Sequence, residues 1–194
     1  MILPTSHSHN HPSTDPKNLP VNFNKTSVTT LHLSPPGPHP VSELLNPPET
    51  ARSYSSVFNG EAVGTEYARS MLDSPQAWSA AQNSAGQWMT IDLGTSRQVV
   101  GVAIQGRSPP AHSQHVTGFT VQHSMDGVSF ASLPTTFTSD ATGQATARVM
   151  FSQVTARYVR IVAQTFQDHL SMRAGVLLAP GQFRVTNSAD LPAS

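Results

Sequence analysis

The chain has 194 residues, of which 37% are hydrophobic and 11% are charged, a length that suits one domain of ordinary size and a tail. Its 11 Lys and Arg residues balance its 11 Asp and Glu residues, so no net charge attracts nucleic acid or an anionic bilayer. The absence of cysteine excludes a disulfide scaffold, a thiolate zinc site and a cysteine nucleophile.

Residues 1–50 form a segment rich in proline, histidine and serine, with runs such as HSHNHPSTDP and SPPGPHP. Such a segment cannot bury enough apolar surface to offset the entropy lost on ordering, so we expect it to be disordered or loosely attached. His7, His9 and His11 alternate and could chelate a metal weakly, but a solvated low-complexity tail is the better interpretation.

Two further features of the N-terminal region bear on its structure and location. The run VSELL at residues 41–45 predicts a single helical turn, which the following Pro47 and Pro48 would end. Residues 1–20 are polar and lack the apolar stretch of a signal peptide. No apolar run approaches the 18 residues of a membrane-spanning helix.

From about Tyr54 the pattern changes to short apolar runs that alternate with turn signals. Asp126-Gly127 predicts a hairpin turn. The regular spacing and the absence of a useful helical period favour an antiparallel sandwich or jelly roll. The predicted strands are residues 88–93, 99–105, 116–123, 146–151, 157–163 and 174–178.

Five motifs in a fixed order then make the pattern specific. They are SMLDSPQAWSAAQNSAGQWMTIDLG (70–94), VAIQGR (102–107), QHVTGFTVQHSMDGVSF (114–130), ARYVRIVAQTF (156–166) and HLSMRAGVLL (169–178). Residues 54–180 thereby resemble the discoidin family, the coagulation factor V/VIII C-type domains. The resemblance implies an all-β, antiparallel, eight-stranded jelly-roll β-sandwich of the galactose-binding-like type. It also implies a non-enzymatic module whose loops at one end bind a ligand, with residues 181–194 as a C-terminal tail.

The chain departs from the family at positions where ligands usually bind. Many animal members join their two ends by a disulfide, which this chain lacks. His115 stands where the family often has tryptophan, and Thr165-Phe166-Gln167 replaces a loop that often carries another aromatic residue. The ligand of any one member therefore does not transfer to this chain.

Asp73 and Arg107 are the first candidates for ligand binding. In collagen-receptor members, the acid and the arginine of the matching motifs meet at the floor of the ligand groove, although the arginine before that acid is Met71 here. A carboxylate and a guanidinium at a rim suit sugar hydroxyls or peptide amides. The alternative is a salt bridge between loops, with no ligand.

His115, Phe166 and His169 complete the candidate site at the same end. An imidazole can donate, accept and stack, and an aromatic ring at a rim suits the apolar face of a galactose-type sugar. The alternatives are structural: His169 could cap the loop before the last strand, and Phe166 could pack beneath its own loop.

Other polar and aromatic residues are assigned to structure. Trp78, Trp88 and Tyr158 lie inside strand-like motifs and are expected in the core. Arg173 is expected to pair with a buried acid such as Asp92.

The sequence favours no resident cofactor and no metal. In glycan-binding relatives a structural Ca²⁺ is held near residues 59–66, where Asn59, Glu61 and Glu66 could supply oxygens. The segment lacks a dense aspartate cluster, so this Ca²⁺ is the weaker alternative. His115 and His169 have no third ligand at zinc spacing.

These features leave three functions open. Glycan recognition, perhaps of the galactose type and serving adhesion or cell-surface attachment, comes first, and binding of an extracellular protein comes second. Anionic phospholipid binding comes last because no lysine follows Lys25. Hydrolase, metalloprotease, P-loop and dinucleotide-binding motifs are absent from the sequence, and nucleic acid is not expected as a partner. The family favours an extracellular or cell-surface location, against the missing signal peptide, and no feature indicates an oligomeric state.

Overall fold

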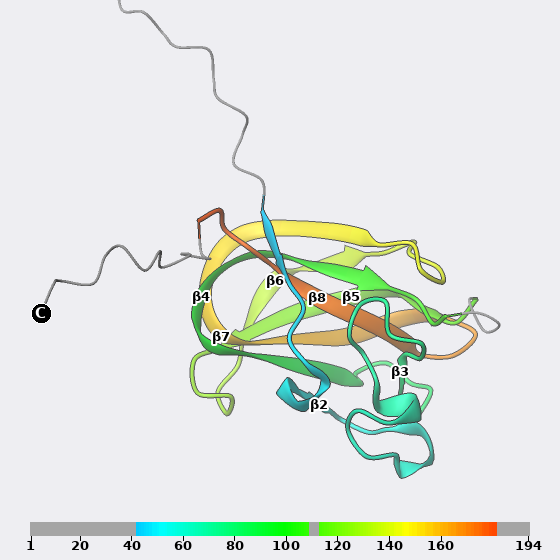
Figure 1. Ribbon diagram of the computed structural model, residues 1–194. Helices are drawn as coiled ribbons and strands as arrows, with labels where there is room; N and C mark the ends of the chain where they lie inside the picture. The colour runs from blue at the N-terminus through cyan, green and yellow to red at the C-terminus, as the bar shows by residue number, and fades with distance from the viewer. Residues whose placement is uncertain (1–41, 109–112, 182–194) are drawn as a thin grey trace, which may run out of the picture. The chain divides into compact units, whose positions relative to one another are not determined.

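A computed structural model describes residues 42–108 and 113–181 (Figure 1). Short 3-10 helices occupy Glu49–Ala51 (η1), Phe58–Gly60 (η2) and Glu66–Ala68 (η3). The strands are β1 (Glu43–Leu45), β2 (Arg52–Tyr54), β3 (Trp78–Ser79), β4 (Trp88–Gln105), β5 (His115–Ser124), β6 (Ala131–Thr138), β7 (Ala147–Gln167) and β8 (Ser171–Leu178).

The strands pair antiparallel in the order β1-β8-β4-β7-β5-β6, with β2 added to β4 and β3 to β8. β4 and β7 pair along most of their length, and their register shifts between Asp92 and Arg97. Beyond this irregularity β4 leaves β2 and joins β8, while β5 pairs only with the second part of β7. The two long strands therefore bend and contribute to both layers of a sandwich, as Figure 1 shows. This arrangement confirms the prediction of an all-β, antiparallel, eight-stranded jelly roll.

Each predicted strand lies within an observed one, except that Thr146 precedes β7, but the sequence split two of them. Residues 88–93 and 99–105 are parts of the single strand β4, and residues 146–151 and 157–163 belong to one segment that β7 spans almost entirely. The prediction also missed β6, whose Pro134 is tolerated because β6 lies at the edge of the sheet order.

The core lies between the two layers and follows the alternation of the strands. Val159, Ile161 and Ala163 of β7 are buried, as is Trp78, which confirms the expectation for this tryptophan. β8 is buried at every position, because Leu72 packs on its outer face against Leu177. The segment around Leu72 therefore covers the second layer.

Trp88 and Tyr158 were expected in the core, and this prediction is wrong because both lie half-exposed. The Arg160 guanidinium lies 4.0 Å from the ring centroid of Trp88 and 3.7 Å from that of Phe130. The Arg157 guanidinium lies 4.9 Å from the ring centroid of Tyr158. These rings cover arginine side chains on the outside of the sheet. Successive side chains of a strand point to opposite faces, so a residue next to a buried one is expected to face outward.

The expected pairing of Arg173 with Asp92 is also wrong. Arg173 is fully buried, but its guanidinium donates to the backbone carbonyls of Gly106, Ser74 and Gly143 at 3.0, 2.7 and 2.6 Å. Asp92 instead pairs with Arg157, with Nε to Oδ1 at 2.9 Å. Arg173 is thus a structural residue that joins three segments.

Residues 41–45 were expected to form a helical turn, and this is wrong for Glu43–Leu45, which pair with β8. β1 approaches β8 closely because Gly175 has no side chain. A Cβ there would lie 2.8 Å from Leu72 Cδ1 and 3.0 Å from the Leu45 carbonyl oxygen. The fold therefore includes residues N-terminal to position 54, whereas the low-complexity residues 1–41 and residues 182–194 lie outside the described part of the chain.

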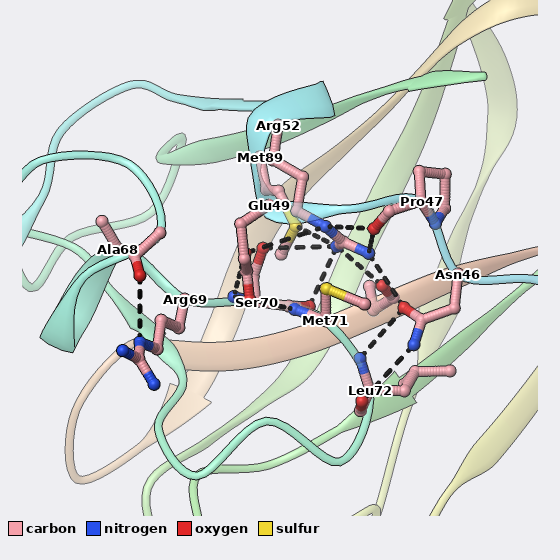
Figure 2. A network of polar contacts seen from close by, with 12 residues as sticks. Asn46, Pro47, Glu49, Arg52, Ala68, Arg69, Ser70, Met71, Leu72 and Met89 are labelled. Atoms are coloured by element: carbon pink, nitrogen blue, oxygen red, sulfur yellow. Dashed lines mark hydrogen bonds and ion pairs between the residues drawn. The ribbon is translucent and has the colours of Figure 1, made fainter. Parts of the chain in front are cut away.

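A buried arginine connects this N-terminal part to the rest of the fold (Figure 2). Arg52 Nη1 donates to the carbonyls of Ser70 and Ala174 at 2.9 and 2.8 Å, and Nη2 donates to the Pro47 carbonyl and Asn46 Oδ1, both at 3.0 Å. Burial lowers the pKa of Arg52 to about 10, against the opposing effect of Glu49. The guanidinium thereby holds the segment after β1, the segment after η3 and strand β8 together.

Glu49 and Tyr54 complete this network. The Glu49 carboxylate accepts hydrogen bonds from the backbone amides of Ser70 and Met71 at 2.8 to 3.0 Å. Tyr54 Oη donates to the Ala68 carbonyl at 3.0 Å, and burial raises the pKa of this phenol to about 12. Residues 68–71 are therefore fixed on the sheet, which places the preceding helix η3. None of the helices in residues 42–108 and 113–181 is long and apolar enough to cross a membrane.

Candidate functional site

The connections from β4 to β5 and from β7 to β8, and the segment from η2 to β3, meet at one end of the sandwich (Figure 1). They enclose a hollow of about 140 Å³. Its lining residues come from all three connections and are Phe58, Tyr67, Ser79, Arg107, Gln114 and His169.

Arg107 lies two residues after the end of β4 and is held on three sides. Its Nε donates to Gln76 Oε1 at 3.0 Å, and its Nη1 donates to Gln114 Oε1 at 2.8 Å. The guanidinium also lies 5.0 Å from the ring centroid of Tyr67, in cation–π contact. No residue in the described part of the chain accepts a hydrogen bond from its Nη2. The side chain therefore presents an ordered donor to the hollow.

Three rings, those of Phe58, Tyr67 and His169, also line the hollow. Phe58 contacts Tyr67 edge to face at a centroid distance of 5.0 Å, and His169 at 5.8 Å. Phe58 is 38% exposed, so part of this ring faces solvent. His169 Nδ1 lies 3.4 Å from Ser171 Oγ, which in turn lies 2.8 Å from Ser79 Oγ.

The hollow thus combines ring faces with a guanidinium, an imidazole, an amide and a hydroxyl group. Its described lining residues include no carboxylate, so it lacks the acid pair of a glycosidase and the negative ligands that a cation prefers. The arrangement suits a neutral ligand that has both an apolar face and hydroxyl groups.

Two of the five predicted binding residues, Arg107 and His169, line this hollow together. Asp73 is exposed and lines a second hollow, together with Arg69 and Met71. Its Oδ1 accepts a hydrogen bond from Gln105 Nε2 at 2.8 Å. Within the described residues no ion pair joins Asp73 to Arg107, so the alternative of a salt bridge between these two loops is wrong.

His115 and Phe166 do not line either hollow. His115, the first residue of β5, is 9% exposed, and its Nδ1 lies 2.7 Å from the carbonyl oxygen of Ser113. Phe166 is half-buried and packs against the core. Their roles in binding stay predictions, and packing accounts for both positions in the structure.

Sequence reasoning missed Phe58, Tyr67, Gln76 and Gln114. A signal for the two aromatic residues was present: they stand in FNGEAVGTEYA, a stretch of residues 58–68 without strand alternation. Aromatic residues in such a stretch are not explained by a sheet core, and they become candidates for a site on a loop. The two glutamines carried no comparable signal.

The structure does not favour the Ca²⁺ site considered near residues 59–66. The Gly64 carbonyl accepts a hydrogen bond from Arg69 Nε at 3.0 Å, and the Ala62 carbonyl accepts from Thr65 N and Oγ1. The Arg69 guanidinium beside the Gly64 carbonyl would repel a divalent cation. Among the residues that the structure describes, no group of three or more His, Cys, Asp or Glu could hold a metal ion.

Comparison with known proteins decides the family. The sequence model of the F5/8 type C domain matches residues 50–176, which include the first hollow, all of the second except Glu49, and most of the sandwich. The chain belongs to the F5/8 type C domain family. The resemblance stated from the five motifs is therefore confirmed.

Curated relatives of this F5/8 type C domain include two lactadherins. The chain is 33% identical to mouse lactadherin over 107 residues, which are 52% of this chain and 23% of the relative. It is 30% identical to rat lactadherin over 137 residues, which are 66% of this chain and 32% of the relative. The chain thus spans a third or less of these relatives.

Solved structures confirm the fold of the F5/8 type C domain at low sequence identity. Discoidin II of Dictyostelium discoideum is 17% identical with a TM-score of 0.52, covering 66% of this chain and 54% of that chain. The family 32 CBM of Clostridium perfringens NanJ, solved in complex with galactose, is 18% identical with a TM-score of 0.53, covering 70% of this chain and 99% of that chain. The C. perfringens module CpGH89CBM32-5, in complex with GalNAc-β-1,3-galactose, is 17% identical with a TM-score of 0.55, covering 71% and 100%.

Proposed function

We propose that this F5/8 type C domain is a non-catalytic glycan-binding module whose ligand is a galactose-type sugar. The observation that carries the proposal is the first hollow, in which partly exposed aromatic rings stand beside an arginine that Gln76 and Gln114 hold in place. Aromatic rings stack on the apolar face of a sugar, and a fixed guanidinium donates to its hydroxyl groups.

Each lining residue has a role in this proposal. Phe58 and Tyr67 supply the apolar contact, and Arg107 donates through Nη2. Gln114 and His169 supply a further donor or acceptor, because amide and imidazole groups can do both. Since both Arg107 and its glutamine partners are already ordered, little rotamer entropy is lost on binding.

Two of the structural neighbours support the sugar class. The NanJ module was solved with galactose, and CpGH89CBM32-5 with a disaccharide that ends in galactose and GalNAc. Their similarity to this chain is one of fold, so the ligand is argued from the hollow itself. A further neighbour is a chitosan-binding module derived from a chitosanase/glucanase, which shows a binding domain of this fold attached to an enzyme.

The cellular role we propose is adhesion or attachment to a cell surface, at an extracellular location. Binding of an extracellular protein is the second candidate, and it is favoured by the exposed hydrophobic side chains of Phe58 and Val63. Binding to an anionic membrane is less favourable, because no lysine occurs within residues 50–176.

A glycan array probed with the full chain tests the proposal, followed by calorimetric titration of the best sugar. We expect binding to glycans with terminal galactose or N-acetylgalactosamine. An array without signal would contradict glycan binding and favour a protein partner. Binding confined to acidic glycans would contradict the neutral galactose-type ligand.

A further inference from the structure

A second hollow, of about 360 Å³, lies beside the LDS motif and is larger than the first. Its described lining comes from η1, the segment before η3 and the segment after it: Glu49, Gly64, Arg69, Met71, Leu72, Asp73, Ser74 and Pro75. The function proposed above uses none of these residues.

Two groups of opposite charge in this hollow have unused hydrogen-bonding capacity. Arg69 donates through Nε to the Gly64 carbonyl at 3.0 Å, and within the described chain its two Nη atoms have no acceptor. Asp73 Oδ1 accepts from Gln105 Nε2 at 2.8 Å, and no described residue donates to Oδ2. The Glu49 carboxylate, in contrast, is engaged by backbone amides.

The arrangement at Asp73 is built rather than accidental. Gln105 is 2% exposed, and its amide contacts Asp73 twice, donating to Oδ1 at 2.8 Å and accepting from the Asp73 backbone amide at 2.9 Å. Asp73 also has a φ of 64°, a conformation that costs energy in most residues with a side chain. A buried glutamine thus holds an exposed carboxylate at the rim.

The second hollow adjoins the first through two short connections. Gln105, the last residue of β4, forms a hydrogen bond with Asp73 of the second hollow. Arg107, two residues later, lines the first hollow and forms a hydrogen bond with Gln76. The end of β4 therefore reaches both hollows. Tyr67 of the first hollow and Arg69 of the second are also two residues apart. Two residues of chain span at most about 7 Å, so the two hollows are built on neighbouring residues of the same two segments.

We infer that the second hollow is an adjoining subsite, so that the domain binds a neutral oligosaccharide of two or more sugar units; this inference rests on the proposed glycan function. The Asp73 carboxylate accepts from the hydroxyl groups of the next sugar, and Arg69 donates to them. Met71 and Pro75 contribute apolar surface. The charge of Glu49 is offset by Arg52, whose Nε lies 3.9 Å from Glu49 Oε2. The remaining opposite charges of Arg69 and Asp73 favour a neutral sugar over an acidic or basic one.

Calorimetric titration of the full chain with D-galactose, galactobiose and galactotriose tests the inference. For the unaltered protein we expect the affinity to rise at least about tenfold from galactose to galactotriose, the scale of one or two added charged hydrogen bonds. In Arg69→Gln and in Asp73→Asn the gain should fall below about threefold, with the affinity for galactose unchanged.

The substitutions are chosen to keep the loop folded. Asparagine tolerates a positive φ and still accepts the hydrogen bond from Gln105, and thermal unfolding checks both variants. Arg157→Gln is the matched control, since it removes a partly exposed arginine from the outer face of the sheet and should keep the full gain.

The titrations distinguish failure of the subsite from failure of the proposed glycan function. Galactose binding that does not strengthen with chain length, or a gain that survives both substitutions, would overturn the subsite and leave the single-sugar site standing. Failure of the unaltered protein to bind any of the three sugars would overturn the proposed galactose-type function and this inference with it.

Discussion

At the scale of single residues, the candidate site depends on how side chains are held before a ligand arrives. Arg107 is fixed by two glutamines and a tyrosine ring, and His169 by an edge-to-face contact with Phe58. A donor held in this way binds without first losing much conformational freedom. The affinity of the site should therefore depend strongly on a few residues.

Arg107→Ala should weaken sugar binding by about 1–3 kcal/mol, the scale for the loss of a charged hydrogen-bonding partner. The fold should persist, because Arg107 lies after the end of β4 and its partners Gln76 and Gln114 remain partly exposed to water. Calorimetric titration measures the loss, and thermal unfolding checks the fold. Unchanged affinity would make Arg107 a structural residue.

The pair formed by Asp92 and Arg157 should make stability depend on pH in the acidic range. The hydrogen bonds from Arg157 hold the pKa of Asp92 below its usual value of 3.8. The folded state therefore keeps Asp92 charged where the unfolded state takes up a proton, so stability is present above the usual pKa and is lost as the pH falls below it.

We expect Asp92→Asn to flatten the decline of unfolding free energy between about pH 5 and pH 3. Urea unfolding at several pH values measures the slope. A parallel series with Ser53→Ala, which lies on the neighbouring strand β2 and titrates no proton, controls for substitution on this face. Equal slopes for the Asn variant and the unaltered protein would contradict the role of Asp92.

At the scale of elements, the loops that carry the site are connected to the sheet by polar groups rather than by apolar packing alone. Arg52 joins the segment after β1, the segment after η3 and strand β8, and Arg173 joins three further segments. Both guanidinium groups donate mainly to backbone carbonyls, which would otherwise be buried without a partner. The position of Tyr67 in the site therefore depends on residues that never contact the ligand.

Arg52→Leu should lower the free energy of unfolding by at least about 3 kcal/mol, because the carbonyls of Pro47, Ser70 and Ala174 lose their donors inside the protein. Urea unfolding measures this loss. Arg157→Leu, at an arginine that is 41% exposed, should cause a much smaller change. If both variants were equally stable, the Arg52 network would not hold these elements together.

At the scale of the whole molecule, positively and negatively charged residues are equal in number. The described lining of the first hollow includes no carboxylate. Nothing in the composition concentrates ions at the surface, so recognition depends on short-range contacts. This separates the glycan proposal from binding to an anionic membrane, which requires long-range attraction.

Raising the NaCl concentration from 50 to 500 mM should change the affinity for a neutral sugar by no more than about twofold. Salt screens the interaction between charges, and a neutral sugar carries no charge. Titration at three salt concentrations measures this. A loss of affinity of tenfold or more would show that charge dominates binding and would contradict a neutral ligand.

Local pattern in the sequence was sufficient for the class of fold. Alternation in residues 157–163 places Val159 and Ile161 in the core, and five ordered motifs identify the family. The same pattern was insufficient for Trp88 and Tyr158, which stand in strand-like motifs but face outward. Alternation tells which residues share a face, but only the packed layers decide which face is inside.

The candidate site was predictable only in part, for a related reason. Arg107 and His169 could be carried over from matching motifs, but Phe58 and Tyr67 come from two short 3-10 helices outside the strands, and Phe58 meets His169 about a hundred positions later in the chain. The sequence by itself determined the family, through five ordered motifs, and the sandwich, through short-range patterns of apolar and turn residues. Only the tertiary structure decided that Arg107 and Asp73 line separate, adjoining hollows, because that depends on Gln76 and Gln105, whose contacts are made across the fold.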